Sequence, residues 1–538
     1  RLTVVSIPRM VATAVLLRPI GVLRVMRLRF VGNRKGALAR FVRLFDSIAA
    51  PSYAAWTALR DAEDVRDRPG RIAELAAWPR RPRVDVRIGA GSAAAVAATR
   101  AALDAQIYPD IRSMGAGEAV DGDVVVDVPA GVVPSPEAIW HLVRPFAFDP
   151  RAVAAYCDED EIDRFGRRRS PVFRGAWSPA LAEAGGLSPT IVMLRRDLLG
   201  DAGATTGERL VAAAAGRRSA VHHVPRVCVH RPVGAAPPKP VARPAPRPAA
   251  GERPKVSVII PSRDRAELLA ACVDGLFHRT AGVDLDVVIV DNGSVEAETA
   301  RLWERLAADP RIRRIERPGP FNFPDLIAAG VAEARCDLLL LLNNDVEPIE
   351  PGWLAAMVAE LGEPEVGAVG ARLLFPDGHV QHGGVTLGAG GVARHTFHFF
   401  GLRDGEDRGL LATRRDVSAV TAACLLTRRT LWDCVGGMDG RLFAVAYNDV
   451  DFCLALRKAG LRVVWTPEAT LVHRESVSRG ANDTPEKRSR LAAEEAEMLA
   501  RWGAELSNDP FHSPNLSLFG EGFEVEPIPR DRKARVPS

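Results

Sequence analysis

The chain has 538 residues, of which 47% are hydrophobic and 26% are charged, and its formal net charge at pH 7 is +4. This length and apolar content predict two globular domains, each with its own core. The small net charge, without a recognised nucleic-acid module, argues against a nucleic-acid-binding protein. Seven scattered cysteines, an odd number, argue against a disulfide framework and for a reducing compartment.

The first 50 residues are basic and interleaved with apolar side chains. They contain ten Arg and Lys against one acid, Asp46. Two interpretations stay open: an amphipathic segment on an anionic membrane surface, or a helix packed on the protein with a solvated basic face. The longest apolar run, 10–17, is shorter than the roughly 20 residues that span a bilayer, and it lacks the cleavage site of a signal peptide. We therefore expect a cytoplasmic protein, with peripheral contact at the inner face of the cell membrane under the first interpretation.

Two apolar, strand-like segments, Val84–Ile88 and 124–126, mark the N-terminal half, and a single carboxylate, Asp127, follows the second. Further along, the acidic run 158–163 is either a metal site or, as charge runs more often are, a solvated acidic loop. Residues 232–254 are rich in Pro, Ala and Arg and have no apolar period. This composition predicts a semi-rigid, extended linker between two globular halves.

A βαβ unit opens the C-terminal half. An apolar strand at 256–260 ends in Pro261, a helix follows over 267–277, and a second apolar strand at 287–290 runs into Asp291. Gly293, two residues on, allows close backbone approach. Asp291 is therefore placed to accept hydrogen bonds from a nucleotide base or ribose, although the same residues also make an ordinary turn.

The most informative strand is the run Leu338–Leu342, which ends in Asn343, Asn344 and Asp345. A continuous apolar run bounded by polar residues predicts a strand buried on both faces, at the centre of a sheet. Ligands of open α/β sheets bind outside the carboxyl ends of such strands, and oxygen ligands suit a hard cation such as Mg2+ or Mn2+. A turn is the alternative, but two strands that both end in a carboxylate favour function.

Two acids, Asp449 and Asp451, stand at the start of an apolar-periodic helix. In one interpretation, both are first-turn acids that the helix dipole favours. In the other, one of them is a general base that faces a cleft. On spacing alone the first interpretation is the stronger. A further amphipathic helix is predicted over 485–502, followed by an irregular arm. The residues expected on the buried face of this helix are Leu491, Met498 and Leu499.

A series of motifs in the C-terminal half follows an order known from one enzyme family: 256–261, 290–294, 321–323, 341–345, 381–384, 421–424, 436–439, 448–451 and 473–476. Over about residues 254–482 the chain resembles family-2 inverting glycosyltransferases of GT-A fold. It is most similar to the branch associated with O-antigen and rhamnan-type cell-surface polysaccharides. The resemblance implies an α/β catalytic domain with a Rossmann-like mixed sheet, the fold of nucleotide-diphospho-sugar transferases.

The resemblance also implies roles for single residues. Asp449 falls at the position of the catalytic base, and Asp345 and His473 fall at positions that contact Mn2+ or Mg2+. The residues expected at the nucleotide sugar are Pro261, Arg263, Asp291, Ser294, Asn343 and Asn344. Those expected on the sugar and acceptor side are Gln381, His382, Gly383, Thr421, Ala422, Asn448 and Asp451. The implied reaction is a single in-line displacement at the anomeric carbon.

Some positions depart from the family pattern. Asn343 opens the metal-binding D-x-D motif and supplies one less negative charge than Asp, and Ile327-Ala328 replaces a common Asn pair. Upstream, residues 156–163 with Phe173 and 177–179 resemble the later part of a second transferase-like domain that tandem members of this family carry. Because its acidic cluster is reduced to Asp127, we predict that this upstream domain is a catalytically silent scaffold.

The predicted division is a basic amphipathic extension at 1–80, a smaller, degenerate GT-A-like α/β domain at 81–231, a linker at 232–254, a catalytic GT-A domain at 255–482 and a C-terminal helix and tail at 483–538. The expected function is transfer of a sugar from a nucleotide-diphosphate sugar, of dTDP-rhamnose or UDP-hexose type, to a glycan or lipid-linked glycan acceptor in cell-surface polysaccharide synthesis. One alternative is a non-catalytic glycan-binding or assembly protein that keeps the fold. Another is a nucleotidyltransferase, which the lack of a Gly-rich phosphate loop disfavours.

Overall fold

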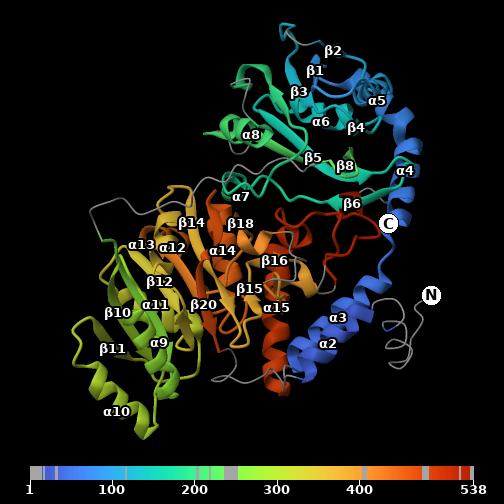
Figure 1. The fold of residues 1–538 in the computed structure, drawn as a ribbon. Coiled ribbons are helices and arrows are strands. Elements are labelled where there is room, and N and C mark those ends of the chain that lie inside the picture. The colour runs from blue at the N-terminus through green and yellow to red at the C-terminus, as the bar shows by residue number, and fades with distance from the viewer. Residues whose placement is uncertain are drawn as a thin grey trace. The chain divides into compact units, whose positions relative to one another are not determined.

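The computed structural model describes residues 15, 19–30, 34–115, 118–200, 205–216, 220–235, 253–402, 409–474, 484–519 and 523–533 (Figure 1). The chain forms two compact units. The first comprises Arg1–Leu44, Pro244–Asp509 and Leu518–Glu521, and the second comprises Phe45–Arg243, Pro510–Ser517 and Gly522–Ser538. Most of the predicted linker lies outside the described residues. None of the described helices combines the length and the hydropathy needed to cross a membrane.

A mixed sheet forms the centre of the first unit. Its strands are β9 (Lys255–Ser262), β10 (Asp284–Asp291), β11 (Ile312–Glu316), β12 (Leu338–Leu342), β13 (Val346–Pro348), β14 (Val366–Leu374), β15 (Val380–His382), β18 (Arg415–Asp416), β19 (Cys424–Arg428) and β20 (Arg462–His473). The strand order is β11-β10-β9-β12-β19-β14-β20-β13, with β15 beside β14 and β18 beside β20. As predicted, β12 is central: it pairs with parallel β9 and antiparallel β19, and four of its five leucines are fully buried.

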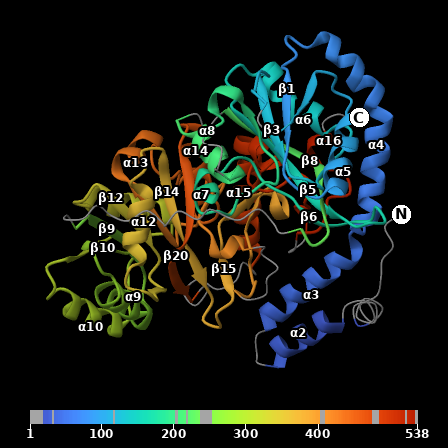
Figure 2. The same ribbon diagram turned by 45° about the horizontal axis from the view of Figure 1, so that its top comes forward.

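Helices cover this sheet. They are α9 (Ala266–His278), α10 (Ala297–Leu306), α11 (Phe323–Glu333), α12 (Trp353–Leu361), α13 (Arg429–Val435), α14 (Asn448–Lys458) and α15 (Pro485–Ser507). The prediction of a helix over 267–277 is confirmed by α9. Helix α11 packs on β9 and β10. Helix α12 packs on β14 and β20 (Figure 2). The predicted α/β class with a Rossmann-like mixed sheet is therefore confirmed.

The second unit is also built on a mixed sheet. Its strands are β1 (Val84–Ile88), β2 (Ile111–Met114), β3 (Val124–Val128), β4 (Val133–Pro134), β5 (Ala154–Ile162), β6 (Arg168–Val172), β7 (Met193–Arg195) and β8 (Val221–Pro232). Their order is β2-β1-β3-β7-β5-β8-β4, with β6 beside β5. This order reproduces β10-β9-β12-β19-β14-β20-β13, with β15 beside β14, and each corresponding pair runs in the same relative direction. The two units thus share one topology, and the first adds two strands, β11 at the edge and β18 beside β20.

The acidic run at 158–163 is neither the metal site nor the solvated loop considered above. Most of it belongs to β5, where Asp158, Glu159 and Asp160 are at most 3% exposed. Each of these buried carboxylates has a cationic or imidazole partner. The contacts are Asp158 Oδ1 to His223 Nε2 at 2.8 Å, Glu159 Oε1 to Arg174 Nη2 at 3.1 Å, and Asp160 Oδ1 to His230 Nδ1 at 2.6 Å. Partners inside the protein thus balance the charge of this run. The spacing of the acids in the sequence does not reveal those partners.

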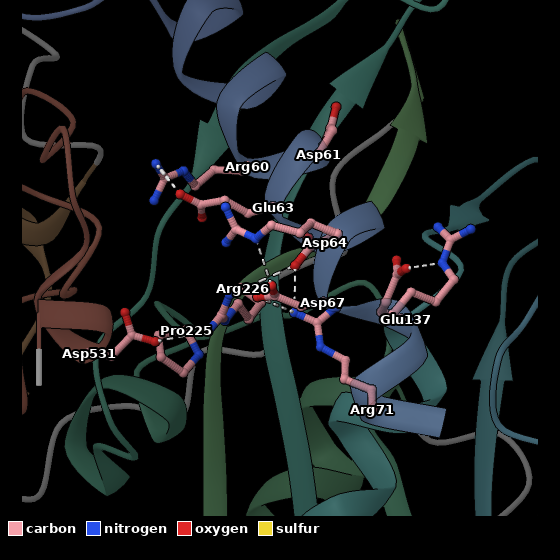
Figure 3. A network of polar contacts seen from close by, with 12 residues as sticks. Arg60, Asp61, Glu63, Asp64, Asp67, Arg71, Glu137, Pro225, Arg226 and Asp531 are labelled. Atoms are coloured by element: carbon pink, nitrogen blue, oxygen red, sulfur yellow. Dashed lines mark hydrogen bonds and ion pairs between the residues drawn. The ribbon is translucent and has the colours of Figure 1, made fainter. Parts of the chain in front are cut away.

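The long helix α4 (Tyr53–Glu74) is attached to the second unit by polar contacts (Figure 3). Arg226 Nη1 of β8 lies 3.9 Å from Asp64 Oδ1, and Arg68 Nε donates to Glu137 Oε1 at 2.8 Å. At its start, the Tyr53 hydroxyl donates to Asp160 Oδ2 at 2.6 Å. Residues that we expected to form a separate N-terminal extension are therefore part of the structure of this unit from the start of α4 onward.

Candidate active site

The loop 421–423, just before β19, connects three parts of the first unit. The N–H of its first residue donates to His382 Nε2 at 3.4 Å, and the N–H of its second residue donates to Asp449 Oδ2 at 3.0 Å. The carbonyl of its third residue accepts from the Asn343 N–H at 3.1 Å. Residues predicted from three distant motifs therefore meet at one short loop, at the carboxyl end of β12: Asp449 and His382 through their side chains and Asn343 through its backbone N–H.

A buried acid and a buried imidazole lie at facing ends of two paired strands, β13 and β20. Asp345 precedes β13 and is 4% exposed, and His473 ends β20 and is 8% exposed. His473 Nε2 lies 3.1 Å from Asp345 Oδ1 because β13 and β20 pair with Val346 opposite His473. On the other side of the ring, His473 Nδ1 donates to Gln381 Oε1 at 2.6 Å. This bond turns the lone pair of Nε2 toward Asp345.

The pair fits a divalent cation in its donor chemistry. A carboxylate oxygen and an imidazole nitrogen suit Mn2+, and carboxylate oxygen suits Mg2+. Within the described residues no group of three His, Cys, Asp or Glu side chains is placed to hold a metal. A cation at Asp345 and His473 would therefore take further ligands from a phosphate or from water, as Mg2+ commonly does.

His382 follows Gln381 in the sequence and is fully buried. Its Nδ1 lies 2.6 Å from His395 Nδ1. Burial, and then the neighbouring His395 and Arg415, hold the pKa of His382 well below its ordinary value, so the ring is neutral. Gly383 follows, and a Cβ there would lie 3.0 Å from the Phe397 ring. Gly383 is thus required for packing, whatever it contributes to a ligand.

The nucleotide side predicted from β9 and β10 is held by its own contacts. Asp291 is fully buried, and its Oδ1 accepts from the Ser294 N–H at 2.9 Å and from the Ser294 hydroxyl at 2.6 Å. Its Oδ2 accepts from Arg314 Nε at 3.0 Å. Arg314, from β11, was not predicted from the sequence, because its partner lies 23 residues away on another strand.

Asn344 links this region to the end of β12. Its Nδ2 donates to Ser262 Oγ at 3.0 Å, and the Ser262 carbonyl accepts from the Asn292 N–H at 2.8 Å. Of the other two residues predicted on this side, Pro261 is buried within β9 and Arg263 is exposed just beyond it. The predicted nucleotide residues therefore lie along the carboxyl ends of β9, β10 and β12.

Asp449 sits in the first turn of α14. The preceding residue but one, Tyr447, has a left-handed φ of 62°, which turns the chain into the helix. Asp449 Oδ1 accepts from the Val450 N–H at 2.9 Å, while Oδ2 accepts from the loop 421–423 as described above. Asn448 is buried, and its Nδ2 donates to the Phe443 carbonyl at 3.3 Å. Two backbone N–H groups thus fix the direction of the partly exposed Asp449 carboxylate.

Asp451 has a different environment from Asp449. It is 4% exposed, and its Oδ1 accepts from Trp502 Nε1 at 2.7 Å and from Arg501 Nη1 at 2.9 Å. These donors come from α15, so the contacts favour a supporting role for Asp451 over the sugar contact that we expected. The same helix places Glu494 under the loop before α14, as described next.

Helix α15 supports the loop that carries Asp449. Glu494 is 4% exposed, and its two oxygens accept from the Val445 N–H at 2.8 Å and the Ala446 N–H at 3.2 Å. The buried residues of α15 are Glu494, Met498, Trp502 and Leu506. The prediction of Met498 on the buried face is confirmed, whereas Leu499 is 51% exposed, so its assignment to that face is wrong. The four-residue spacing of the buried set was visible in the sequence, but a Glu within it was not an obvious core residue.

Comparison with known proteins adds to this geometry. Residues 257–436 match the model described as "Glycosyl transferase family 2". This segment belongs to glycosyltransferase family 2. The family 2 segment contains Asp291, Asp345 and the loop 421–423, and it ends before Asp449 and His473.

Longer similarities extend beyond the family 2 segment. The chain is 35% identical over 539 residues to "Uncharacterized protein y4gI" of Sinorhizobium fredii (strain NBRC 101917 / NGR234), covering 90% of this chain and 57% of that protein. It is 32% identical over 454 residues to "O-antigen biosynthesis protein RfbC" of Myxococcus xanthus, covering 76% of this chain and 35% of that protein. The chain thus spans about half or less of the length of these two relatives.

A shorter relative matches the family 2 region. The "N-acetylglucosaminyl-diphospho-decaprenol L-rhamnosyltransferase" of Mycobacterium tuberculosis (strain CDC 1551 / Oshkosh) is 26% identical over 215 residues, covering 36% of this chain and 68% of that protein. These similarities agree with the resemblance to family-2 glycosyltransferases recognised in the sequence, and they confirm that resemblance for residues 257–436.

Proposed function

We propose that this chain is an inverting glycosyltransferase that moves a sugar from a nucleotide-diphosphate sugar to a glycan or lipid-linked glycan in cell-surface polysaccharide synthesis. The observation that carries the proposal is the convergence of Asp449, His382 and Asn343 on the loop 421–423. Two relatives also support the proposal. The name of the Myxococcus xanthus protein states O-antigen biosynthesis, and that of the mycobacterial enzyme states rhamnosyl transfer to a diphospho-decaprenol-linked sugar.

Asp449 is the proposed general base. Its carboxylate is oriented by two backbone N–H groups and is partly exposed, so an acceptor hydroxyl has access to it. Removing the proton from that hydroxyl as its oxygen attacks the anomeric carbon assists a single displacement with inversion. Such a base needs no covalent sugar intermediate. Asn448 and Gln381 help to fix the surrounding backbone and the His473 ring.

Asp345 and His473 would hold Mn2+ or Mg2+. Such a cation supplies charge neutralisation to the departing diphosphate. The chain's own contribution is to keep the two donors 3.1 Å apart and buried, with the His473 tautomer fixed by Gln381. Asn343 in place of the first acid of the D-x-D motif leaves the site with less negative charge than the full motif gives. We expect this to weaken metal binding when no nucleotide is present.

For the donor, we propose a dTDP-rhamnose or UDP-hexose type of nucleotide sugar. Asp291, Ser294 and Arg314 form a fixed group at the carboxyl end of β10, and β9 lies between this strand and β12, whose end carries Asn344 and Asp345. We propose that the nucleotide binds at the end of β10, with its diphosphate toward Asp345. The named activity of the mycobacterial relative supports the rhamnosyl donor.

Peripheral membrane contact is part of the proposal. Helix α2 (Pro19–Phe30) contains Arg24, Arg27 and Arg29 and no acid. Three of its apolar side chains, Leu23, Met26 and Phe30, are between 61% and 93% exposed. Their spacing of three and four residues puts them on one side of the helix. An apolar stripe flanked by arginines suits an anionic lipid surface, where lipid-linked acceptors are located.

Release of nucleoside diphosphate from dTDP-rhamnose, UDP-glucose and UDP-galactose tests the function. The assay includes lipid-linked glycans as acceptors and is run with Mn2+ or with EDTA. We expect metal-dependent release from one donor, reduced by Asp345→Ala and by Asp449→Asn. Loss of the base alone is expected to cost about 10²- to 10⁴-fold in rate while donor binding is retained. The matched control is Asp433→Asn, a nearby acid in α13 outside the site.

Two results would count against the proposal. Release that is unchanged in Asp449→Asn would remove Asp449 as the base. Donor binding without release of nucleoside diphosphate across the donor panel would favour the non-catalytic assembly role, and release of pyrophosphate would favour a nucleotidyltransferase.

A further inference from the structure

The shared topology of the two units allows their active-site positions to be compared one by one. In the first unit, Val346 of β13 pairs with His473 of β20, and Asp345 is the residue before β13. In the second unit, Val133 of β4 pairs with His230 of β8. The position of Asp345 is therefore occupied by Val132, whereas the position of His473 keeps a histidine, His230.

The remaining catalytic positions follow from the same alignment of elements. Helix α8 (Thr206–Ala214) precedes β8 as α14 precedes β20, so Gly207, its second residue, stands where Asp449 stands in α14. In the sheets, Val124 of β3 pairs with Arg195 of β7 as Leu338 of β12 pairs with Arg428 of β19. Thr190, five residues before Arg195, therefore stands where Ala423 stands in the loop 421–423. The second unit thus lacks the base and the metal acid.

His230 also has a different role from His473. Its Nδ1 is taken by Asp160 Oδ1 at 2.6 Å, and Asp160 is in turn bonded to Tyr53 and Arg168. This network is fully inside the protein, since Asp160 has no exposed surface. The predicted loss of catalysis in this domain therefore has a chemical explanation: its metal ligands are replaced or committed to structural bonds.

A cavity nevertheless remains at this place in the second unit. It has a volume of about 360 Å³, and its lining includes Val132, Thr190, Thr206, Gly207 and Arg231. These residues correspond to Asp345, Ala423, Asn448, Asp449 and Arg474, respectively, by the correspondence set out above. The cavity thus occupies the position of the sugar-handling part of the site in the first unit. A volume of this size accommodates one sugar residue.

Two of the lining residues have buried polar atoms without a partner. Thr190 is 5% exposed, and its Oγ1 has no hydrogen-bond partner among the described residues. Arg231 is 6% exposed, and its Nε and Nη1 also lack hydrogen bonds there. Ion-pair contacts of 3.4 Å to Glu159 and 3.7 Å to Glu161 balance its charge without satisfying these donors. Buried groups of this kind normally find a partner in protein, water or ligand.

We propose that this cavity binds one sugar residue of a glycan without a metal ion. Thr190 Oγ1, the Arg231 guanidinium and the first-turn N–H groups of α8 offer mostly donors, which match the hydroxyl and carboxylate oxygens of a saccharide. The replacement of both acids by Val132 and Gly207 removes the need for a cation. The inference depends on the proposed function only for the class of ligand, a sugar. A tandem enzyme gains from such a site because two linked sites hold one glycan more tightly than either alone.

Gly207 offers a direct way to fill the cavity. Its φ is not positive, and an added Cβ would be 3.8 Å from the Leu187 carbonyl oxygen and 3.9 Å from Ser188 Oγ. Both are ordinary contact distances, so Gly207→Leu occupies the cavity without forcing the backbone. The matched control is Gly70→Leu in α4 of the same unit, where nothing lies within 4 Å of an added Cβ. Thr190→Val is a second, nearly isosteric variant that removes only the hydroxyl.

The test is saturation-transfer NMR on the full chain in EDTA, with methyl α-L-rhamnoside, methyl α-D-glucoside and D-glucuronate as probes. We expect at least one probe to bind, with the signal lost in Gly207→Leu and kept in Gly70→Leu. Thr190→Val should weaken binding by about 2- to 10-fold, the range expected for one hydrogen bond. Thermal unfolding of each variant verifies that the second unit is folded.

Binding must also survive Asp345→Ala, because that variant changes only the first unit. A probe that is lost in Asp345→Ala and kept in Gly207→Leu would place the sugar in the first unit and overturn the inference. The absence of binding for all three probes would overturn it as well. If nucleoside diphosphate release fails while these probes bind, the proposed function is refuted and the sugar site stands.

Discussion

The support that α15 gives to the Asp449 loop makes a specific prediction for Glu494. This carboxylate is buried and accepts two backbone N–H groups, from Val445 at 2.8 Å and Ala446 at 3.2 Å. The two acceptor oxygens hold the turn that ends in the left-handed Tyr447 and begins α14. Glu494→Ala removes both bonds at once and leaves the acid Asp449 itself unchanged.

The expected cost follows from the two bonds. A hydrogen bond to a charged group contributes about 1.5–3 kcal/mol, so two contribute about 3–6 kcal/mol. Val445 and Ala446 are only partly buried, and water can replace part of the loss, so we expect about 3 kcal/mol. At about 2–4 °C per kcal/mol for a domain of this size, Tm should fall by roughly 6–12 °C.

Activity should fall more than stability suggests. A shift of about 1 Å in a catalytic group costs about 100-fold in rate, so kcat for transfer should drop by about that factor. The donor KM should stay constant, because Asp291 and Ser294 belong to other loops. Thermal unfolding and nucleoside diphosphate release measure the two effects. The control is Glu497→Ala, an exposed acid on the same helix. The reasoning is refuted if Glu494→Ala and Glu497→Ala have the same Tm and the same kcat.

Three further predictions test other parts of the structure. Gln381→Leu removes the acceptor for His473 Nδ1, so Mn2+ affinity measured by calorimetry should fall about 10- to 100-fold. Gln381→Glu keeps an acceptor and should retain most of the affinity. Equal affinities of the two variants would rule out this orienting role. Burial would by itself raise the pKa of Asp160, but the bond from His230 and the charge of Arg168 outweigh it and hold this pKa below its ordinary value. The ionised carboxylate therefore stabilises the fold above about pH 4, and this stabilisation is lost as pH falls through the folded-state pKa. Urea unfolding between neutral and acid pH should show a smaller pH dependence in Asp160→Asn than in Asp61→Asn, an exposed control that also contacts Arg168. Finally, replacing Leu23, Met26 and Phe30 together by Ser should abolish sedimentation with phosphatidylserine vesicles. The same change at three exposed side chains of α4 should leave sedimentation unchanged; these are Leu59, Val65 and Ile72. Equal binding by both variants would exclude α2 as the contact.

The features that sequence reasoning recovered are those encoded locally. The strand at Leu338–Leu342 and the helix over 267–277 follow from continuous or periodic apolar residues, and both occur as predicted. The strand ends that carry Asp291 and Asp345 were found because a buried strand must stop where polar side chains begin. Proximity between Asp345 and His473 could be expected only through the family resemblance, since 127 residues lie between them in the sequence.

The features that were missed depend on contacts between distant segments. Asp451 belongs to the same short motif as Asp449, yet Arg501 and Trp502 of α15 engage it and leave Asp449 accessible. The acidic run of β5 was read as solvated because a run of charges is usually exposed, whereas its partners His223, Arg174 and His230 come from other strands and loops. Charge in a sequence therefore indicates exposure only when no partner of opposite charge folds onto it.

Under the proposed function, the two units share one topology and differ at few of the positions that the reaction needs. In the first unit, the acid before β13 faces the imidazole at the end of β20, and that pair is left for a cation. In the second, Val132 replaces the acid, and the retained His230 bonds to Asp160 of β5. Once the metal acid is gone, a buried imidazole needs another partner, and β5 supplies one from the neighbouring strand. The replacement is chemically consistent with the cavity above it, where uncharged side chains and one arginine line a space that no longer has to hold a diphosphate. Restoring catalysis there would require at least an acid at 132, an acid at 207 and release of His230 from Asp160, so a single substitution cannot convert the second unit into a transferase.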